Sequence, residues 1–163
     1  MLDLSLDTSS PSSGVVHEID THRTEFPIVL DGPQSLSLGM VMRGRSGMQI
    51  CGATHVPEAA ALAGVPCGCP LTWGERRALS RAGRGPKPAI AVRFRLVEEP
   101  ALGNFDLLSS SWALMEDAHV VAPALGTKGS PTTAVLRVDQ LAVTTADGVE
   151  VIGRRPSIQL SRR

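Results

Sequence analysis

The pattern of apolar and polar positions along the chain predicts a sheet of mostly antiparallel strands. Every second residue of 89–97 is apolar, the period expected for a strand with one buried face. A shift of one residue would bury the intervening arginines, so the pattern determines which face is buried. The apolar positions are Ile90, Val92, Phe94 and Leu96.

Two more long strands are predicted at 105–115, returning antiparallel to the first, and at 133–143. Shorter strands are predicted at 15–19, 26–30, 36–42, 48–51 and 150–152.

Turn residues separate these strands and indicate how they connect. The simplest interpretation of 15–19 and 26–30 is a hairpin, and Asp31-Gly-Pro33 then closes the segment. Asp147-Gly148 is the dipeptide of a type I′ hairpin, which predicts that the strands on either side of it pair. A polar stretch rich in Gly and Pro, residues 123–131, is predicted as an interruption between strands.

Two short helices are predicted between the strands. Residues 57–64 are predicted to form one or two helical turns, because proline is common at the start of a helix and glycine at its end. Thr72 and Glu75 match a capping box, which predicts a helix over 76–82 that ends at Gly83. Its apolar positions are sparse, so we expect a narrow buried stripe and arginines in solvent. That stripe consists of Trp73, Ala78, Leu79 and Ala82.

These elements predict one α+β domain with a mostly antiparallel sheet, one or two short helices and a small zinc-stabilised loop region. A chain of 163 residues suits a single domain with its own core. The start is rich in small polar residues and indicates a flexible lead-in over 1–14. The domain is expected over 15–153, and a basic tail over 154–163.

Composition restricts the classes of function. Apolar residues make up 42% of the chain and charged residues 20%, which indicates a globular protein rather than a disordered one. Aromatic residues make up only 3%, so stacking platforms for single-stranded nucleic acid are not expected. Sixteen basic residues balance sixteen acidic ones, and this removes the overall positive field of a free-standing DNA-binding protein. A protein partner fits better. The lack of an apolar span or signal peptide pattern predicts a cytoplasmic protein.

The charges are nevertheless unevenly distributed along the chain. Residues 1–35 carry six acids and one arginine, whereas residues 71–95 carry seven bases and one acid. Two interpretations stay open at this point. In the first, the two segments are solvated faces that pair with each other, and each exposed ion pair stabilises the fold by less than about 1 kcal/mol. In the second, they form separate charged surfaces.

One group of residues has the chemistry of a metal site. Cys51, His55, Cys67 and Cys69 supply the three thiolates and one imidazole that tetrahedral zinc accepts. Four protein ligands leave no open position, so such a zinc is structural. The alternative is a set of free buried thiols, and His17 or His119 are substitutes for His55.

The basic helix is the best candidate for a partner-binding surface. Its alternative is an ordinary solvated helix face. Trp73 and Trp112 are more often core anchors than interface residues, although tryptophan is enriched at interfaces. The proposed partner-binding residues are Trp73, Arg76, Arg77, Arg81, Arg84 and Lys87.

No combination of residues indicates catalysis. The segment Gly83-Arg-Gly-Pro-Lys87 lacks the Gly-Lys-Ser/Thr ending of a phosphate loop, and its proline removes a backbone donor. No Ser/His/carboxylate set stands out, so no catalytic residue is predicted and the chain is expected not to be an enzyme. The alternatives are a zinc-binding nucleic-acid-associated module and a small metal-dependent hydrolase.

A series of motifs resembles one family. The chain is similar to the recombination directionality factors that actinobacteriophages encode beside large serine integrases, over about residues 28 to 152. Such relatives often have a further cysteine near Gly85-Pro86-Lys87, which this chain lacks, so the resemblance makes His55 the needed fourth ligand. The motifs, in order, are Leu30-Asp-Gly-Pro33, Gly44-Arg-Ser-Gly-Met48, Val65-Pro-Cys-Gly-Cys-Pro70, Glu75-Arg-Arg77, Ala82-Gly-Arg-Gly-Pro-Lys-Pro88, Phe94-Arg-Leu96, Leu102-Gly-x-Phe105 and Ser110-Ser-Trp112.

The resemblance implies a non-enzymatic accessory protein in the cytoplasm of a bacterial host. Such a factor binds the integrase, at its coiled-coil region by expectation, and contacts attachment-site DNA only through it. The integrase alone joins phage and host sites. With the factor bound, hybrid sites recombine, the prophage is excised and the integrative reaction is inhibited.

Overall fold

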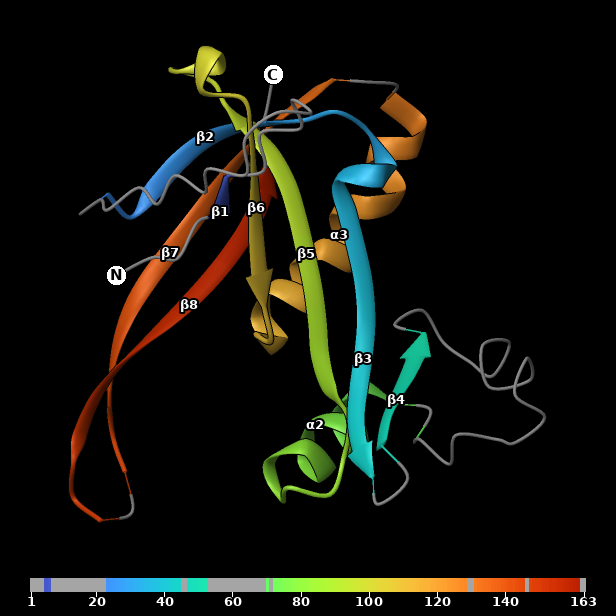
Figure 1. Ribbon diagram of the computed structural model, residues 1–163, viewed down its shortest axis with the longest axis vertical. Coiled ribbons are helices and arrows are strands. Elements are labelled where there is room, and N and C mark those ends of the chain that lie inside the picture. The colour runs from blue at the N-terminus through green and yellow to red at the C-terminus, as the bar shows by residue number, and fades with distance from the viewer. Residues whose placement is uncertain are drawn as a thin grey trace.

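Strand β5 is the centre of an antiparallel sheet (Figure 1). The computed structural model describes residues 5–6, 23–44, 47–52, 70, 72–128, 131–145 and 147–161. Within these residues the strand order is β1-β6-β5-β2-β7-β8, with β3 also on β5 and β4 on β3. The strands are β1 (Ser5–Leu6), β2 (Glu25–Leu30), β3 (Leu36–Gly44), β4 (Gly47–Gly52), β5 (Lys87–Leu96), β6 (Asn104–Ser109), β7 (Thr132–Thr144) and β8 (Glu150–Leu160).

The sheet divides into two branches along one edge of β5. Strand β6 occupies the other edge, where Phe94 lies opposite Phe105 and the two rings stack at 5.7 Å. On the divided edge, β3 pairs with the first part of β5 and β2 with its end, so that Leu36 lies opposite Val92 and Ile28 opposite Leu96. A short 3-10 helix, η1 (Pro33–Ser35), makes the bend between these strands, and a second, η2 (Pro100–Leu102), precedes β6.

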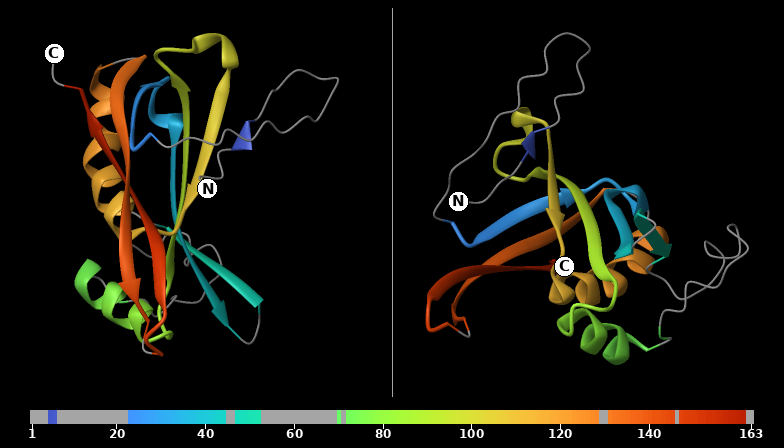
Figure 2. Two further views of the ribbon diagram at one scale, coloured as in Figure 1. Left: turned by 90° about the vertical axis from the view of Figure 1, so that its left-hand side faces the viewer. Right: turned by 60° about the horizontal axis from the view of Figure 1, so that its bottom comes forward.

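Helix α3 (Trp112–Lys128) covers one face of the sheet and packs chiefly against β8 (Figures 1 and 2). Its buried side chains recur at the helical spacing of three and four residues, which explains why this segment is a helix. The opposite face of the helix carries the exposed residues Glu116, Val120 and Pro123. The buried helical residues are Leu114, Met115, Ala118, Val121 and Leu125, and they pack against Phe26, Ile28, Leu30, Ile90, Val92, Phe94, Phe105, Leu136 and Ile158 of the strands.

Several sequence predictions are confirmed. The α+β class and the mostly antiparallel sheet are observed, and the predicted strands at 26–30, 36–42 and 48–51 correspond to β2, β3 and β4. The alternation in β5 buries Ile90, Val92 and Phe94, as predicted. No helix in the described part of the chain is long and apolar enough to cross a membrane.

The predicted strand at 105–115 is wrong in its second half. Strand β6 ends at Ser109, and α3 begins at Trp112 because Ser111 caps it: the Ser111 Oγ accepts from Leu114 N at 3.4 Å, and Ser111 O accepts the first helical bond from Met115 N. The predicted interruption between strands at 123–131 contains no described strand, but its residues 123–128 continue helix α3. Pro123 lies inside α3 on its exposed side.

The C-terminal boundary also differs from the prediction. A basic tail was expected from residue 154, whereas β8 continues to Leu160 and buries Ile158 in the core. The Asp147-Gly148 hairpin is present, but Thr145 N donates to Val149 O at 2.8 Å, which closes a longer loop than a type I′ turn. Gly148 ends that loop with a φ of 79°, as glycine does in three-residue hairpin loops.

Two other predictions concern the first part of the chain and the cysteine region. Ser5–Leu6, inside the expected lead-in, pairs with β6 as β1. The predicted strand at 15–19 and the predicted helix at 57–64 lie outside the described residues.

Candidate functional site

The basic helix is helix α2, Trp73–Arg81, and its start follows the predicted cap in part. The Oγ1 of Thr72 accepts from the backbone N of Glu75 at 3.3 Å. In a full capping box the glutamate returns to the backbone of the capping residue. Here the Glu75 carboxylate instead accepts from the Thr72 hydroxyl at 2.8 Å, so the two side chains bind each other.

The end of α2 is built by the Gly-Arg-Gly-Pro segment. Gly83 N donates to Ser80 O and Arg84 N to Leu79 O, both at 3.0 Å, the pair of bonds that defines a Schellman motif. Gly83 has a φ of 71°, which favours glycine. At Gly85 a Cβ would lie 2.6 Å from the Leu79 Cβ. These glycines therefore have a structural role, and they turn the chain from the helix into β5.

Arg76 corrects the expectation that the arginines of this helix face solvent. It is 4% exposed. Its Nε donates to Pro70 O at 2.5 Å, and its NH1 lies 3.6 Å from the Sδ of Met40 in β3. The guanidinium carbon also lies 5.8 Å from the centre of the Trp73 ring, within the range of a cation–π contact. The predicted apolar stripe is wrong in part, because Ala78 and Ala82 are exposed. Arg76 is the helix's buried residue.

Trp73 holds α2 against α3. Its ring meets Trp112 edge to face at 6.0 Å and meets the His119 ring at 4.7 Å. Trp73 packs against the core as a partly buried residue. The Nε2 of His119 is buried with no hydrogen-bond partner among the described residues. Trp73 is thus a packing residue, and it is not a free apolar anchor for a partner.

Four cations of the predicted surface reach solvent. Arg77 forms an exposed ion pair with Glu116 of α3 at 3.1 Å. Arg81, Arg84 and Lys87 are exposed and have no ion pair within the described residues. We call Arg77, Arg81, Arg84 and Lys87 the basic surface. Beside it lies a hollow of about 420 Å³ whose described lining residues are Val41, Met42, Gly83, Arg84, Gly85 and Lys87.

The other cations of the 71–95 segment are paired on the sheet. Arg93 binds Asp106 through two bonds, at 2.9 and 2.8 Å. Arg95 binds Asp31 at 3.2 and 2.6 Å, and that hydrogen bond and charge raise the pKa of Arg95. The interpretation that acidic and basic segments pair therefore holds for Arg93 and Arg95, whereas Arg81, Arg84 and Lys87 of the same segment have no ion pair within the described residues.

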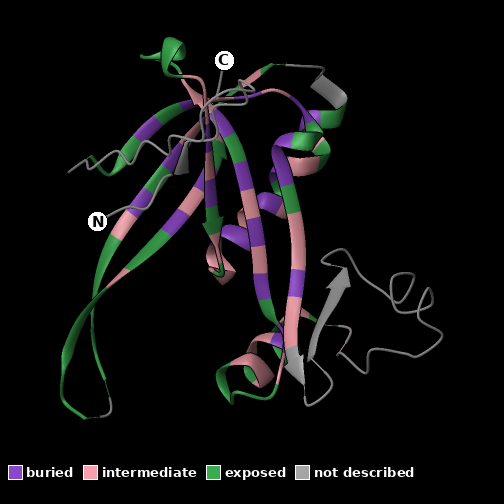
Figure 3. Ribbon diagram, viewed as in Figure 1, coloured by how far each residue is buried: buried purple, intermediate pink, exposed green. Residues whose placement is uncertain are grey.

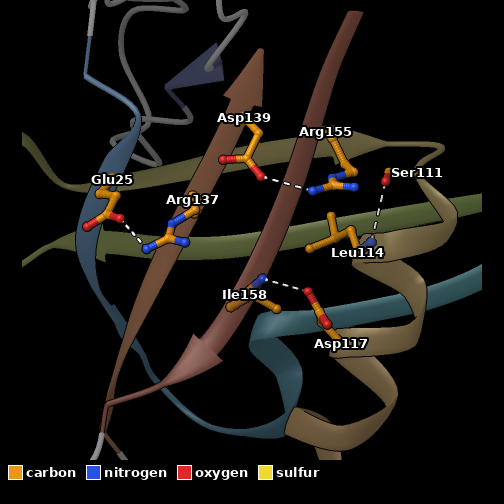
Figure 4. Close-up of polar contacts among 8 residues, drawn as sticks. All are labelled: Glu25, Ser111, Leu114, Asp117, Arg137, Asp139, Arg155 and Ile158. Carbon is orange, nitrogen blue, oxygen red and sulfur yellow. Dashed lines mark hydrogen bonds and ion pairs between the residues drawn. The ribbon is translucent and has the colours of Figure 1, made fainter. Parts of the chain in front are cut away.

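The sheet carries further ion pairs between neighbouring strands. Figure 4 shows Glu25 of β2 with Arg137 of β7, and Asp139 of β7 with Arg155 of β8. Both pairs are exposed, so each stabilises by less than about 1 kcal/mol. Arg155 was expected in a tail and is instead part of this ladder.

The structure describes one of the predicted zinc ligands. Cys51 lies in β4, opposite Met40 of β3. His55, Cys67, Cys69 and the substitute His17 lie outside the described residues, and the other substitute, His119, lies against Trp73. Among the residues that are described, no three His, Cys, Asp or Glu are placed to hold a metal ion. The zinc site stays a prediction from the sequence.

Sequence reasoning missed two features. The Asp117 carboxylate of α3 accepts from Ile158 N of β8 at 3.1 Å, which satisfies a backbone donor of that strand (Figure 4). The β7–β8 hairpin also extends beyond the core and exposes apolar side chains at its far end (Figure 3). The clustering of Leu141, Val143, Val149, Val151 and Ile152 around the Asp-Gly turn was the available signal.

No protein-family model matches the chain, and no solved structure matches it significantly.

Proposed function

We propose that the chain is a phage accessory factor that binds a large serine integrase through the basic surface and switches it from integration to excision. The ordered series of motifs supports the choice of partner. The observation that carries the binding site is the set of three exposed cations, Arg81, Arg84 and Lys87, that have no ion pair within the described residues.

The packing of the motif residues separates structural from surface positions. Arg76, Gly83 and Gly85 are explained by burial, backbone conformation and close approach, and Pro86 is fully buried. Trp112 packs on Trp73. The cations between these residues have no comparable role in the fold. Such cations favour binding to a partner whose surface carries acidic groups. Coiled coils commonly carry charged residues along their flanks.

The proposed mechanism is a shift of population and needs no catalytic group. A factor that binds one arrangement of the integrase more tightly than another favours that arrangement by the ratio of the two affinities. A difference of about 1.4 kcal/mol shifts the ratio tenfold. If the preferred arrangement allows hybrid sites to synapse, excision is favoured and integration is inhibited. DNA recognition stays with the integrase, which agrees with the zero net charge of the chain.

A charge reversal on the exposed part of α2 tests this proposal. Arg77→Glu with Arg81→Glu should weaken binding to the cognate integrase and lower excision, because both side chains lie at the surface and the reversal repels an acidic partner. The control is Arg23→Glu with Arg137→Glu, which makes the same change of charge at two exposed arginines of other elements. Equal integrase binding by the two double variants would overturn the choice of surface.

The proposal also includes a structural zinc and a place of action. The thiolate and imidazole donors of Cys51, His55, Cys67 and Cys69 suit zinc, which would hold these four residues together. As an excision factor the protein acts in the cytoplasm of the bacterial host.

A further inference from the structure

The far end of the β7–β8 hairpin, residues 141–152, is an exposed apolar arm. Val143 lies opposite Val151, and Leu141 lies two residues before Val143, so these three side chains share one face. Their exposed fractions are 39% for Leu141, 51% for Val143 and 47% for Val151, and Val149 beside the loop is 59% exposed. Clustered exposed apolar side chains on a small protein mark an interaction site.

The arm carries charge of one sign. Its charged residues are Asp147 and Glu150, both exposed and both acidic. The arm therefore offers an apolar face beside two negative groups. A fitting surface is apolar inside and basic at its rim, because complementary charge orients two surfaces and like charge opposes their approach.

The hollow beside α2 has these properties. Val41 and Met42 of β3 give it an apolar wall, Gly83 and Gly85 add no side chain to it, and Arg84 and Lys87 make it basic. None of these described lining residues is acidic. Its volume of about 420 Å³ is within the range of about 300–1,000 Å³ found for binding pockets.

The arm and the hollow lie at the same end of the molecule. Figure 1 shows the tip of β7–β8 and helix α2 both at the bottom, on different sides of the molecule, and the left view of Figure 2 also places both at the bottom. A two-fold axis that passes through this end, midway between the tip and the hollow, would place the tip of each copy at the hollow of the other. Each copy then inserts its arm into the hollow of the other, and two equal contacts form at once.

We propose that the protein forms a two-fold dimer in which the arm of each chain, residues 141–152, docks into the basic hollow of its partner. The occupant is a second copy because the hollow on this chain has the apolar wall and the two basic groups that complement the apolar face and the two acidic groups of the arm. Reciprocity strengthens the contact, because the second arm binds within a complex that the first has formed.

This inference goes beyond the proposed function and does not rest on it. Arg84 and Lys87 belong both to the hollow and to the basic surface, so dimerisation and integrase binding compete for them. The tests below contain no integrase and use none of the residues changed in the integrase-binding variant. If these tests fail, the proposed function is unaffected. If the integrase-binding test fails, the proposed dimer is unaffected.

The first test removes the apolar face. Sedimentation equilibrium of the full chain over a series of concentrations should show a monomer–dimer equilibrium. Val143→Asn with Val151→Asn should weaken dimerisation roughly a hundredfold, since polar amides then enter an apolar contact and no charge is added to the arm. The matched control is Leu108→Asn with Val120→Asn, at side chains that are 74% and 77% exposed on β6 and α3. The control should dimerise as the unchanged chain does. A chain that is monomeric at every concentration, or equal loss in both variants, would overturn the proposal.

The second test exchanges charge between arm and hollow. Asp147→Lys with Glu150→Lys gives a chain with a basic arm and a basic hollow, and Arg84→Glu with Lys87→Glu gives one with an acidic arm and an acidic hollow. Each should dimerise roughly tenfold or more weakly alone, because like charges meet in both contacts. An equal mixture should recover dimerisation, as opposite charges then meet in both. Failure of the mixture to recover, with each variant folded by its melting curve, would show that arm and hollow do not meet.

Discussion

Arg76 is the residue on which the position of helix α2 depends. It is a buried cation whose described partners are a backbone oxygen, a thioether and an aromatic ring. These contacts join the segment before the helix, at Pro70, to strand β3, at Met40. A buried guanidinium needs its hydrogen bonds, since an unsatisfied buried polar group costs about 1–3 kcal/mol and more when charged.

Replacing this side chain should therefore destabilise the fold. Arg76→Glu places a carboxylate against Pro70 O, so we expect a loss of about 3 kcal/mol or more in the free energy of unfolding. Arg81→Glu, one turn further along the same helix and exposed, should change it by less than about 0.5 kcal/mol. Urea denaturation measures both. Equal midpoints for the two variants would place Arg76 in solvent.

Asp117 gives the molecule a pH-dependent contact. Burial raises the pKa of its carboxyl, the hydrogen bond from Ile158 N opposes this, Glu116 adds to the rise and Arg155 opposes it. The folded state then holds this proton more tightly than the unfolded state does. The stabilisation is fully present below the unfolded-state pKa, and it is lost as pH rises through the raised pKa.

The variant Asp117→Asn tests this sign, because it keeps an acceptor for Ile158 N and does not titrate. The unchanged chain should be most stable relative to the variant in acid, and it should lose that advantage as pH rises through the raised pKa of Asp117. Urea unfolding at several pH values measures the difference. A difference that grows with rising pH would contradict the predicted direction.

The predicted zinc site consists of Cys51, His55, Cys67 and Cys69. Protein purified without added metal should hold close to one zinc per chain by elemental analysis, and Cys67→Ser should lower both metal content and melting temperature. Ser37→Ala, an exposed change on β3, should lower neither. A metal-free protein with an unchanged melting curve in the Cys67 variant would end the zinc proposal.

At the scale of elements, the end of α2 sets the position of the basic surface. The Schellman bonds and the close approach of Gly85 to Leu79 lead the chain directly into β5. Arg84 and Lys87 lie on either side of this tight turn and remain exposed. The glycines therefore place the cations without contacting a partner themselves.

Adding one methyl group at each of two glycines separates these effects. Gly85→Ala should destabilise the protein by about 1–3 kcal/mol, because its Cβ would meet the backbone N of Ser80 at 2.7 Å as well as the Leu79 side chain. Gly74→Ala, in the first turn of α2, meets nothing within 4 Å and should stabilise by up to about 1 kcal/mol, since alanine is the better helix former. Thermal melting distinguishes the two. A destabilised Gly74 variant, or a neutral Gly85 variant, would contradict this description of the turn.

The elements differ in how far the sequence predicts them. Strand β5 was predictable because one buried face produces a strict period of two. Helix α3 was missed because Pro123 suggests a break and the run before it is apolar enough for a strand, although Leu114, Ala118, Val121 and Leu125 already show the helical spacing. Local pattern therefore indicated the strands better than the helix that covers them.

The candidate site was less predictable than the fold. Nothing local distinguishes Arg76 from Arg77, because burial depends on Met40, which is 36 residues away in the sequence. The Thr72 cap and the Gly83 end of α2 were predictable, since both depend on neighbours along the chain. Residue type thus indicated a basic helix, and tertiary packing decided which of its cations are available.

At the scale of the whole molecule, ion pairs link neighbouring strands of the sheet, whereas Arg81, Arg84 and Lys87 have no ion pair within the described residues. Ion pairs join β2 to β7, β5 to β6 and β7 to β8. The basic surface and the acidic apolar arm both lie at the end that contains α2. A neutral protein can therefore present a local positive surface to a protein partner without an overall attraction to DNA.

A recombination assay with a large serine integrase tests the proposed switch from integration to excision. Plasmids carrying the two hybrid attachment sites, and plasmids carrying the phage and host sites, are incubated with integrase in the presence and absence of this protein. We expect excision products from hybrid sites only when the protein is present, together with inhibition of the integrative reaction. Unchanged products on both pairs of sites, at protein concentrations in excess of integrase, would contradict the proposed switch.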